Sequence, residues 1–252
     1  MFPLIFKSDI KYLKNKRIKE YDIVSGGYNI SKAEGLVEDE DLQLKLDKSD
    51  KKKRQILLGL YARDNKNFTK NLHEGFRKYV NAFIVLNEIN ESNIVAINKD
   101  SVLLYNSNIN RLKFKNVRFT CRGEYTSYLK LGNLQFFYSS VTKEKLVKGI
   151  SIDSIKETLL EEVFTVLALA EANPREKVFK YLYDLRQSYV RKELTNTYYK
   201  ELSSNNGYKF DRVVAGMQFY AENVTEDDVI FDQLDITYNY KNIIIPLCDI
   251  FI

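Results

Sequence analysis

Two aspartates stand where segments typical of β-strands come to an end. Asp22 lies near the end of the predicted strand of residues 18–24, IKEYDIV, which is followed by the turn residues Gly26 and Gly27. Asp100 lies at the tip of IVAINKDSVLLY, where a β-branched apolar run breaks and then resumes. Carboxylates on neighbouring strand ends can share Mg²⁺, a hard cation that prefers oxygen ligands, and paired ions of this kind promote phosphoryl transfer. The spacing alone fits equally well two aspartates that only cap turns.

The composition argues against several other chemistries. The chain has one histidine, His73, and two distant cysteines, Cys121 and Cys248, which disfavours a zinc site, a Ser-His-Asp triad and a disulfide framework. It lacks a GxxxxGK(S/T) phosphate loop and a dinucleotide fingerprint. No apolar run approaches the roughly 20 residues that span a bilayer. We therefore expect a cytoplasmic protein without membrane association.

The net charge of +5 is unevenly distributed. Lysines and arginines crowd residues 7–19 and 51–54, whereas residues 222–235 are acidic. Basic clusters of this kind suit a polyanionic partner such as nucleic acid, although each cluster is equally consistent with an ordinary solvated face.

The elements that would position the two aspartates alternate between strands and helices. The apolar spacing predicts helices over 51–63 and 68–87. After the glycine turn we expect a short helix capped by Asn29 or Ser31, and we interpret the polar residues 37–53 as a mobile loop. The predicted strands are 18–24, 93–98, 101–105, 117–121, 124–130 and 134–139.

From residue 151 the pattern becomes helical. Asn173 and Pro174 end one predicted helix and begin another, as N-cap and first helical residue. The chain therefore predicts an α+β protein in two parts. Residues 1–150 form a sheet domain with a helical insertion at about 50–88, and residues 151–252 form a mainly helical region. The apolar end, residues 243–252, must dock on its own core or on a neighbour, either a second copy or another protein.

Three segments, in chain order, resemble the palm motifs of family B DNA polymerases. Residues 22–28, DIVSGGY, are similar to the Asp-x-x-Ser-x-Tyr run of that family. Residues 54–62, RQILLGLYA, resemble its fingers helix, Lys-x-x-x-Asn-Ser-x-Tyr-Gly, and residues 98–101, NKDS, resemble its Asp-Thr-Asp-Ser hairpin. Residues 122–125, RGEY, echo a later Lys-x-Tyr motif. The resemblance covers roughly residues 18–130 and implies a palm-like antiparallel sheet with a small fingers insertion.

The resemblance implies a role for each matching residue. Asp22 and Asp100 would be the catalytic carboxylates that bind Mg²⁺ or Mn²⁺. Arg54 would meet the phosphates of a nucleotide, with Tyr61 beneath the base pair. The expected supporting residues are Ser25, Gly26, Gly27 and Ser101 around the nucleotide, Arg122 and Tyr125 near the primer, and Lys180 and Arg186 of a thumb along the nucleic-acid backbone.

The chain also departs from that family. Asn98 replaces the first acid of the hairpin motif, Lys99 adds a positive charge beside the expected metal site, and Gly27 stands where the family has its sugar-gating tyrosine. Asp22 and Asp100 are only 78 residues apart, so the fingers are minimal and no proofreading domain fits.

Three functions remain open at this stage. The first is a minimal, phage-like nucleotidyltransferase in the host cytoplasm. The second is a non-catalytic palm-like protein that binds nucleic acid or a replication partner. The third is a phage structural or assembly protein located in the virion.

Overall fold

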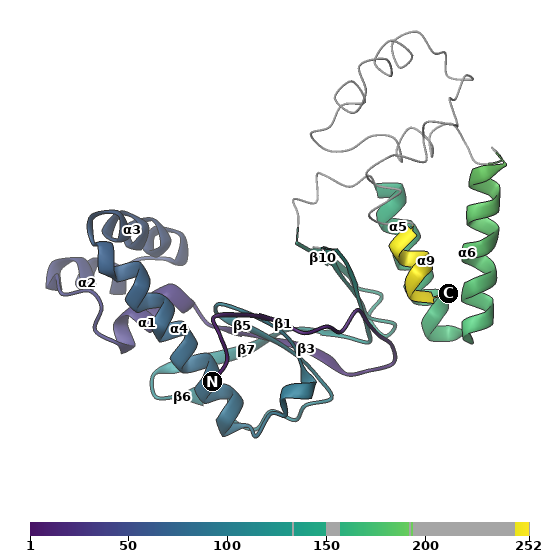
Figure 1. Ribbon diagram of the computed structural model, residues 1–252. Coiled ribbons are helices and arrows are strands. Elements are labelled where there is room, and N and C mark those ends of the chain that lie inside the picture. Colours follow the sequence, from purple (N-terminus) through teal and green to yellow (C-terminus); the bar gives the residue numbers. More distant parts are fainter. Residues whose placement is uncertain (133, 150–156, 192, 194–244, 252) are drawn as a thin grey trace, which may run out of the picture. The chain divides into compact units, whose positions relative to one another are not determined.

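The chain folds into two units (Figure 1). The computed structural model describes residues 1–132, 134–149, 157–191, 193 and 245–251. Unit 1 contains Met1–Asp9 and Lys16–Glu124, and unit 2 contains Ile10–Asn15 and Tyr125–Ile252. Both units combine an antiparallel sheet with helices, which confirms the α+β class. The acidic segment 222–235 lies outside the described residues.

The boundary between the units differs from the one expected at residue 150. The division falls after Glu124 because the next strands pair with one another instead of extending the first sheet. The sheet of unit 2 has the order β10–β9–β8–β2. Its strands are β2 (Tyr12–Leu13), β8 (Ser127–Leu131), β9 (Leu134–Tyr138) and β10 (Lys145–Lys148).

Unit 1 is built on a six-stranded sheet with the order β1–β4–β5–β3–β7–β6. Its central strand β3 has alternating faces, with Tyr21 and Ile23 on the side that packs into the core. Glu20 and Asp22 therefore belong to the opposite side. The strands are β1 (Ile5–Lys7), β3 (Ile18–Ile23), β4 (Ile94–Asn98), β5 (Ser101–Tyr105), β6 (Lys113–Phe114) and β7 (Val117–Tyr125).

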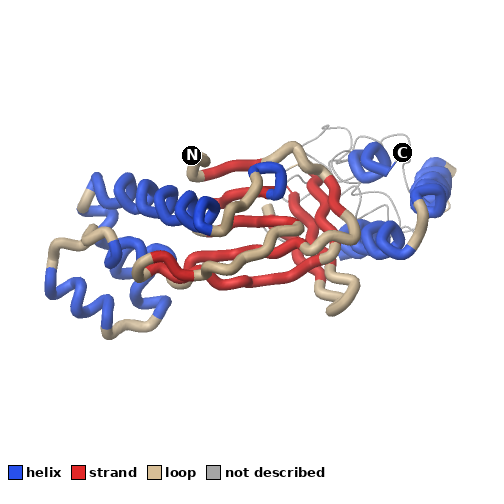
Figure 2. The backbone as a smooth tube through the Cα atoms, turned by 90° about the horizontal axis from the view of Figure 1, so that it is seen from below, coloured by secondary structure: helices blue, strands red, loops and turns tan. Residues whose placement is uncertain are grey.

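Helix α4 (Lys66–Leu86) covers the core face of this sheet, at the place predicted for the second helix. Its apolar residues recur at three- and four-residue intervals, so that Phe76, Tyr79 and Phe83 lie on one face and are buried against the strands. Phe83 stacks on Phe119 of β7 with ring centroids 4.3 Å apart. Figure 2 shows the helices and strands of the chain in blue and red. Figure 1 shows that the first turns of α4 continue beyond the sheet toward α3.

Three further helices pack around these first turns of α4 and correct two expectations. They are α1 (Gly26–Ala33), α2 (Glu40–Asp47) and α3 (Lys51–Asp64). Helix α1 begins at Gly26 and not near Asn29 or Ser31, because the chain turns sharply at Ser25. The predicted loop 37–53 contains α2, whose N-cap is Asp39, and the Asp39 side chain accepts a hydrogen bond from the Leu42 N–H. Its Leu46 is fully buried against Leu58 of α3 and Phe68 of α4.

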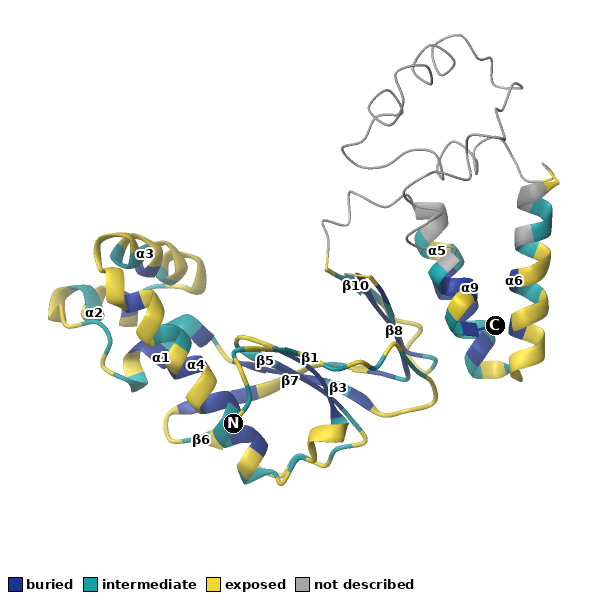
Figure 3. Ribbon diagram, viewed as in Figure 1, coloured by how far each residue is buried: buried dark blue, intermediate teal, exposed yellow. Residues whose placement is uncertain are grey.

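In the described part of unit 2, three helices share one apolar core with the sheet. These are α5 (Glu157–Ala172), α6 (Arg175–Val190) and α9 (Ile245–Phe251). Leu247, Cys248 and Phe251 of α9 are buried in the same core as α5 and α6 (Figure 3). These three side chains of the C-terminal helix thus dock within the unit. Among the described helices, none combines the length and apolar character needed to cross a membrane.

The contact between α1 and α4 depends on a glycine. A Cβ atom at Gly75 would lie 2.4 Å from Cγ2 of Ile30, closer than van der Waals contact permits. We expect Gly75→Ala to lower the free energy of unfolding by about 1–3 kcal/mol, because the core must shift to accept the methyl group. Gly59→Ala in α3 is the matched control, since nothing lies within 4 Å of its Cβ position. Helix propensity alone predicts that this control is about 1 kcal/mol more stable than the parent. Urea unfolding measures both, and a stabilised Gly75→Ala protein would contradict the packing.

Candidate functional site

The two aspartates lie at the same edge of the six-stranded sheet. Asp22 on β3 is paired with Ser101, the first residue of β5, and the Ile23 N–H donates to the Asp100 carbonyl oxygen at 2.9 Å. Because β3 and β5 are antiparallel neighbours, the end of β3 meets the turn that joins β4 to β5. The sheet thus places both residues beside each other, as the sequence predicted.

Both turns at this edge hold a non-glycine residue in the left-handed region. Ser25 has φ 47° where β3 passes into α1, and Lys99 has φ 53° between Asn98 and Asp100. Such conformations cost about 1–3 kcal/mol each and are enriched at functional sites. The Lys99 side chain is exposed, and its backbone N–H donates to the Leu4 carbonyl oxygen.

A cavity of about 370 Å³ opens at this edge. Of the site residues expected from the sequence, Asp22, Asp100, Ser25, Gly26, Gly27, Ser101, Arg54 and Arg122 line it. The remaining lining residues are Glu20, Ile23, Tyr28, Lys51, Gln55 and Leu58, which the sequence analysis did not single out. The carboxylates of the cavity thus come from β3 and the β4–β5 turn. Its cations come from β7, which carries Arg122, and from α3, which carries Lys51 and Arg54.

Gly26 allows the first turn of α1 to approach Asp100 closely. A Cβ atom there would lie 3.1 Å from Oδ2 of Asp100 and 2.9 Å from Cε1 of Phe76, so a larger residue would displace one of these side chains. At Gly27 a Cβ atom would meet only Cδ1 of Leu58, at 3.8 Å, which is ordinary contact. The chain therefore leaves open space on the cavity side of Gly27.

Asp22 is a buried carboxylate with one unsatisfied oxygen. Its side chain is 7% exposed, and Oδ2 forms an ion pair with Nη2 of Arg122 at 2.5 Å. Oδ1 is buried and has no hydrogen-bond partner among the described residues. Burial, followed by repulsion from Asp100, raises the pKa of Asp22 to about 6 despite the opposing effect of Arg122. An unsatisfied buried oxygen of this kind requires an explanation, and a bound cation supplies one.

The donor set of this cavity fits Mg²⁺ or Mn²⁺. No group of three or more histidine, cysteine or acidic side chains is poised to hold a metal within the described residues. Mg²⁺ does not need such a cage, because proteins commonly hold it with one or two carboxylates and leave the other positions to water and substrate phosphates. Asp22 and Asp100 supply two carboxylates of this type. Lys51 and Arg54 on α3 are cations of the type that bind the phosphate groups of a substrate.

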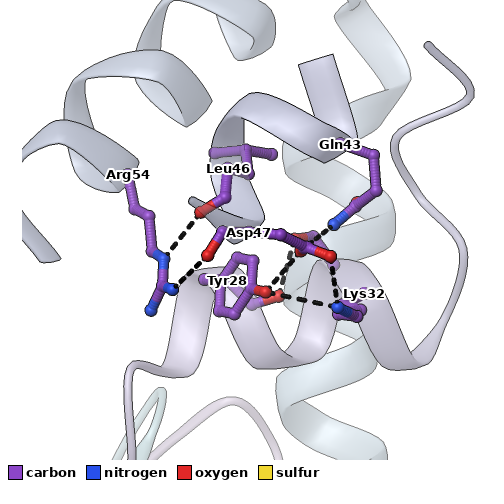
Figure 4. Close-up of polar contacts among 7 residues, drawn as sticks. Tyr28, Lys32, Gln43, Leu46, Asp47 and Arg54 are labelled. Atoms are coloured by element: carbon purple, nitrogen blue, oxygen red, sulfur yellow. Dashed lines mark hydrogen bonds and ion pairs between the residues drawn. The ribbon is translucent and has the colours of Figure 1, made fainter. Parts of the chain in front are cut away.

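Arg54 is fixed in place by a network that joins α1, α2 and α3 (Figure 4). Its Nε and Nη2 donate to the carbonyl oxygens of Leu46 and Asp47 at 2.8 and 3.1 Å, and its guanidinium stacks on the Tyr28 ring at 4.1 Å. The Asp47 carboxylate in turn accepts hydrogen bonds from Tyr28, Lys32 and Gln43. The hydrogen bonds from Lys32 and Tyr28 lower the pKa of Asp47 to about 2.

Helix α3 presents more than one polar side chain to the cavity. Arg54 and Gln55 lie three and four residues after Lys51, Leu58 lies one turn further on, and all four residues line the cavity. The same spacing in the sequence could have revealed Lys51 and Gln55 once Arg54 was chosen. The basic cluster at residues 51–54 is thus only in part a solvated face.

Four of the expected site residues lie elsewhere. Tyr61 is seven residues after Arg54, roughly 10 Å further along the axis of α3. Its ring packs on the ring of Phe68, with ring centroids 5.1 Å apart. The ring of Tyr125 contacts that of Phe137, with centroids 5.1 Å apart, and both residues belong to unit 2. The other two residues are on α6 of unit 2, where Lys180 is exposed and Arg186 has a side chain outside the described set.

With this geometry in place, the comparison with protein families is informative. The model of the bacteriophage PBS1 gene 130 protein family matches residues 5–252, nearly the whole chain. The chain belongs to this phage protein family. The match confirms the phage character expected from the sequence, and the description of the family names no activity. A comparison with curated proteins found no match. The resemblance to family B polymerases therefore remains a hypothesis carried by the residues themselves.

The raised pKa of Asp22 makes the stability of unit 1 depend on pH. Folding favours the protonated form of Asp22. The contribution of this group to the free energy of unfolding is therefore complete below pH 4 and is lost as the pH rises through about 6. At pH 8 we expect Asp22→Asn to be roughly 2–3 kcal/mol more stable than the parent, and at pH 4 about equal to it. Urea unfolding at both values tests this, with Asp9→Asn at an exposed bend as the control. A less stable Asp22→Asn protein at pH 8 would contradict the electrostatics of the site.

Proposed function

We propose that this protein is a minimal palm-type nucleotidyltransferase that extends or modifies a nucleic-acid end by metal-dependent phosphoryl transfer. The observation that carries the proposal is the shared cavity of Asp22 and Asp100, faced by the cations Lys51, Arg54 and Arg122. A cavity lined by three carboxylates, Glu20, Asp22 and Asp100, and by three cations suits a ligand that itself combines a divalent cation with phosphate groups.

Each part of the cavity has a distinct task under this proposal. Asp22 and Asp100 would hold Mg²⁺, which when bound activates an attacking hydroxyl group and stabilises the leaving oxygen. Arg54, held rigidly against α2, and Lys51 would bind the phosphates of the incoming nucleotide. The first N–H groups of α1 lie beside Asp100 at Gly26 and add a further site for anionic oxygens. The Tyr28 ring and the apolar Leu58 side chain would support the remainder of the nucleotide.

The order of elements supports the same proposal. The chain runs from the strand of Asp22, through the helical insertion α1–α3, to α4 and then to the hairpin of Asp100. This is the order that the resemblance to family B polymerases implies. An enzyme of this kind would use the nucleotides of the infected cell, and we therefore assign it to the host cytoplasm.

A non-catalytic relative that binds nucleotides or nucleic acid is the second candidate. It is favoured by the ion pair of Arg122 with Asp22, which neutralises an essential acid, and by Asn98 in place of an acid. The assembly alternative with its virion location drew on the apolar C-terminus, and three of those side chains are covered within unit 2.

The proposal predicts that synthesis depends on both acids. With Mg²⁺ or Mn²⁺, we expect the parent to extend a primer or to add nucleotides to a nucleic-acid end. Asp22→Ala and Asp100→Ala should each lower the rate by roughly 10³-fold, because a metal ion contributes several kcal/mol to the transition state and each 1.36 kcal/mol is a factor of ten.

Asp9→Ala is the control for this experiment and should retain full activity. Metal-dependent binding of nucleotide without synthesis would favour the non-catalytic relative. Activity that survives both substitutions would exclude this cavity as the site.

The open space at Gly27 predicts weak selection against ribonucleotides. No side chain stands there to exclude a 2′-hydroxyl group, so we expect deoxy- and ribonucleoside triphosphates to react within roughly tenfold of each other, about 1.4 kcal/mol. Gly27→Tyr should increase the preference for the deoxy substrate, whereas the outward control Gly59→Ala should not. Single-nucleotide incorporation with each substrate measures the ratio, and a strong deoxy preference of the parent would refute this expectation.

A further inference from the structure

Arg122 occupies an unusual position in the cavity. It extends from β7, and its guanidinium binds the buried Oδ2 of Asp22, yet 53% of its side chain is exposed. One end of the ion pair is thus fixed in the sheet, and the other is attached to a long side chain that is largely surrounded by solvent. Such a side chain can leave its partner without disturbing the core.

We propose that Arg122 is a displaceable counter-ion of the metal site. In the metal-free protein it neutralises Asp22, and when a divalent cation takes Asp22 the guanidinium turns to the phosphate groups of the bound nucleotide. This inference rests on the proposed function, because it assumes that Asp22 is a metal ligand.

The first argument concerns the metal-free site. Asp22 is buried close to a second carboxylate, Asp100, and an isolated buried charge is strongly unfavourable. A cation beside Asp22 relieves part of this cost. Arginine is suited to this task because its guanidinium keeps its own positive charge in proteins.

The second argument concerns competition. A divalent cation and the guanidinium both require the oxygens of Asp22, and their like charges repel each other at short range. Since Oδ1 of Asp22 is unsatisfied and Oδ2 is held by Arg122, a cation that bridges Asp22 and Asp100 must displace or weaken that ion pair. Arg122 therefore lowers the affinity of the empty site for metal.

The third argument concerns the destination of the released side chain. Arg122 lines the same cavity as Lys51 and Arg54, where phosphates would bind. Arg54 is held by the carbonyl oxygens of Leu46 and Asp47 and by the Tyr28 ring, so it is a fixed cation. The Arg122 side chain, in contrast, is 53% exposed, so it can follow the ligand. A guanidinium matches phosphate oxygens in a two-pronged geometry.

The inference predicts that loss of the Arg122 charge changes the affinity for metal and the affinity for nucleotide in opposite directions. In the full-length protein, Arg122→Gln should bind Mn²⁺ alone several-fold more tightly than the parent, because the competing cation is gone. At saturating Mn²⁺ it should bind a non-hydrolysable deoxynucleoside triphosphate analogue about tenfold more weakly, because a charge-assisted contact to phosphate is lost. Titration calorimetry measures both affinities.

Matched variants separate these effects from damage to the fold. Arg118→Gln lies on the same strand, is exposed and does not line the cavity, so it should change neither affinity. Arg122→Lys keeps the charge and should restore most of the analogue affinity while keeping Mn²⁺ binding near the parent value. Thermal unfolding of each variant shows whether unit 1 remains folded.

The outcomes distinguish this inference from the function on which it rests. If the parent binds Mn²⁺ through Asp22 and Asp100 but Arg122→Gln binds it equally or more weakly, Arg122 is not a competing counter-ion and the inference alone fails. If neither protein binds Mn²⁺, the metal site itself is wrong, and the proposed function and the inference fail together. Tighter metal binding with weaker analogue binding supports both.

Discussion

The candidate site depends on the pairing of β3 with β5. The bond from the Ile23 N–H to the Asp100 carbonyl oxygen and the register of Asp22 with Ser101 bring together two acids that are 78 residues apart in the chain. A slip of one residue would turn Asp22 to the face covered by α4 and Tyr21 to the opposite face. The apolar residues Tyr21 and Ile23 prevent this slip, because they are buried against α4. The same packing that stabilises the sheet therefore directs the Asp22 carboxylate toward the cavity.

This arrangement works against stability at the place where chemistry would occur. Folding buries Asp22 beside another acid and holds Ser25 and Lys99 in left-handed conformations. The cost is offset by the core between the sheet and α4, in which aromatic rings such as Phe83 and Phe119 stack. Natural proteins retain local conflicts of this kind mainly where function requires them. A turn cap would need neither the burial nor the unsatisfied oxygen, which is the reason for preferring a ligand site over a structural role for Asp22.

Much of this unit follows from local patterns, and the exceptions have physical causes. Strands β3, β4 and β5 and the helices near 51–63 and 68–87 were predictable, because apolar spacing reports which face is buried, whereas the short strands β1 and β6 were not predicted. Helix α2 was missed because residues 37–53 are mostly polar, and only Leu42 and Leu46 give it an apolar side. The boundary at Glu124 was missed because strand patterns do not say which strands pair. Lys51 was missed because a basic run gives no direction until the helix is known to face Asp22 and Asp100.

The cations of the cavity divide into a fixed and a movable set, and the two sets respond differently to pH. Arg54 is placed by contacts to α2, and the Asp47 carboxylate that ties α2 to α1 has a pKa of about 2, held low by hydrogen bonds from Lys32 and Tyr28. That anchor keeps its charge throughout the physiological range. Asp22 has a pKa of about 6, so protonation below that value weakens its attraction for Arg122 and for any metal. Acidification would therefore disable the carboxylate side of the site while the phosphate side stays assembled. The helical insertion thus acts as a rigid support, and Asp22 with Arg122 forms the part of the site that can change state.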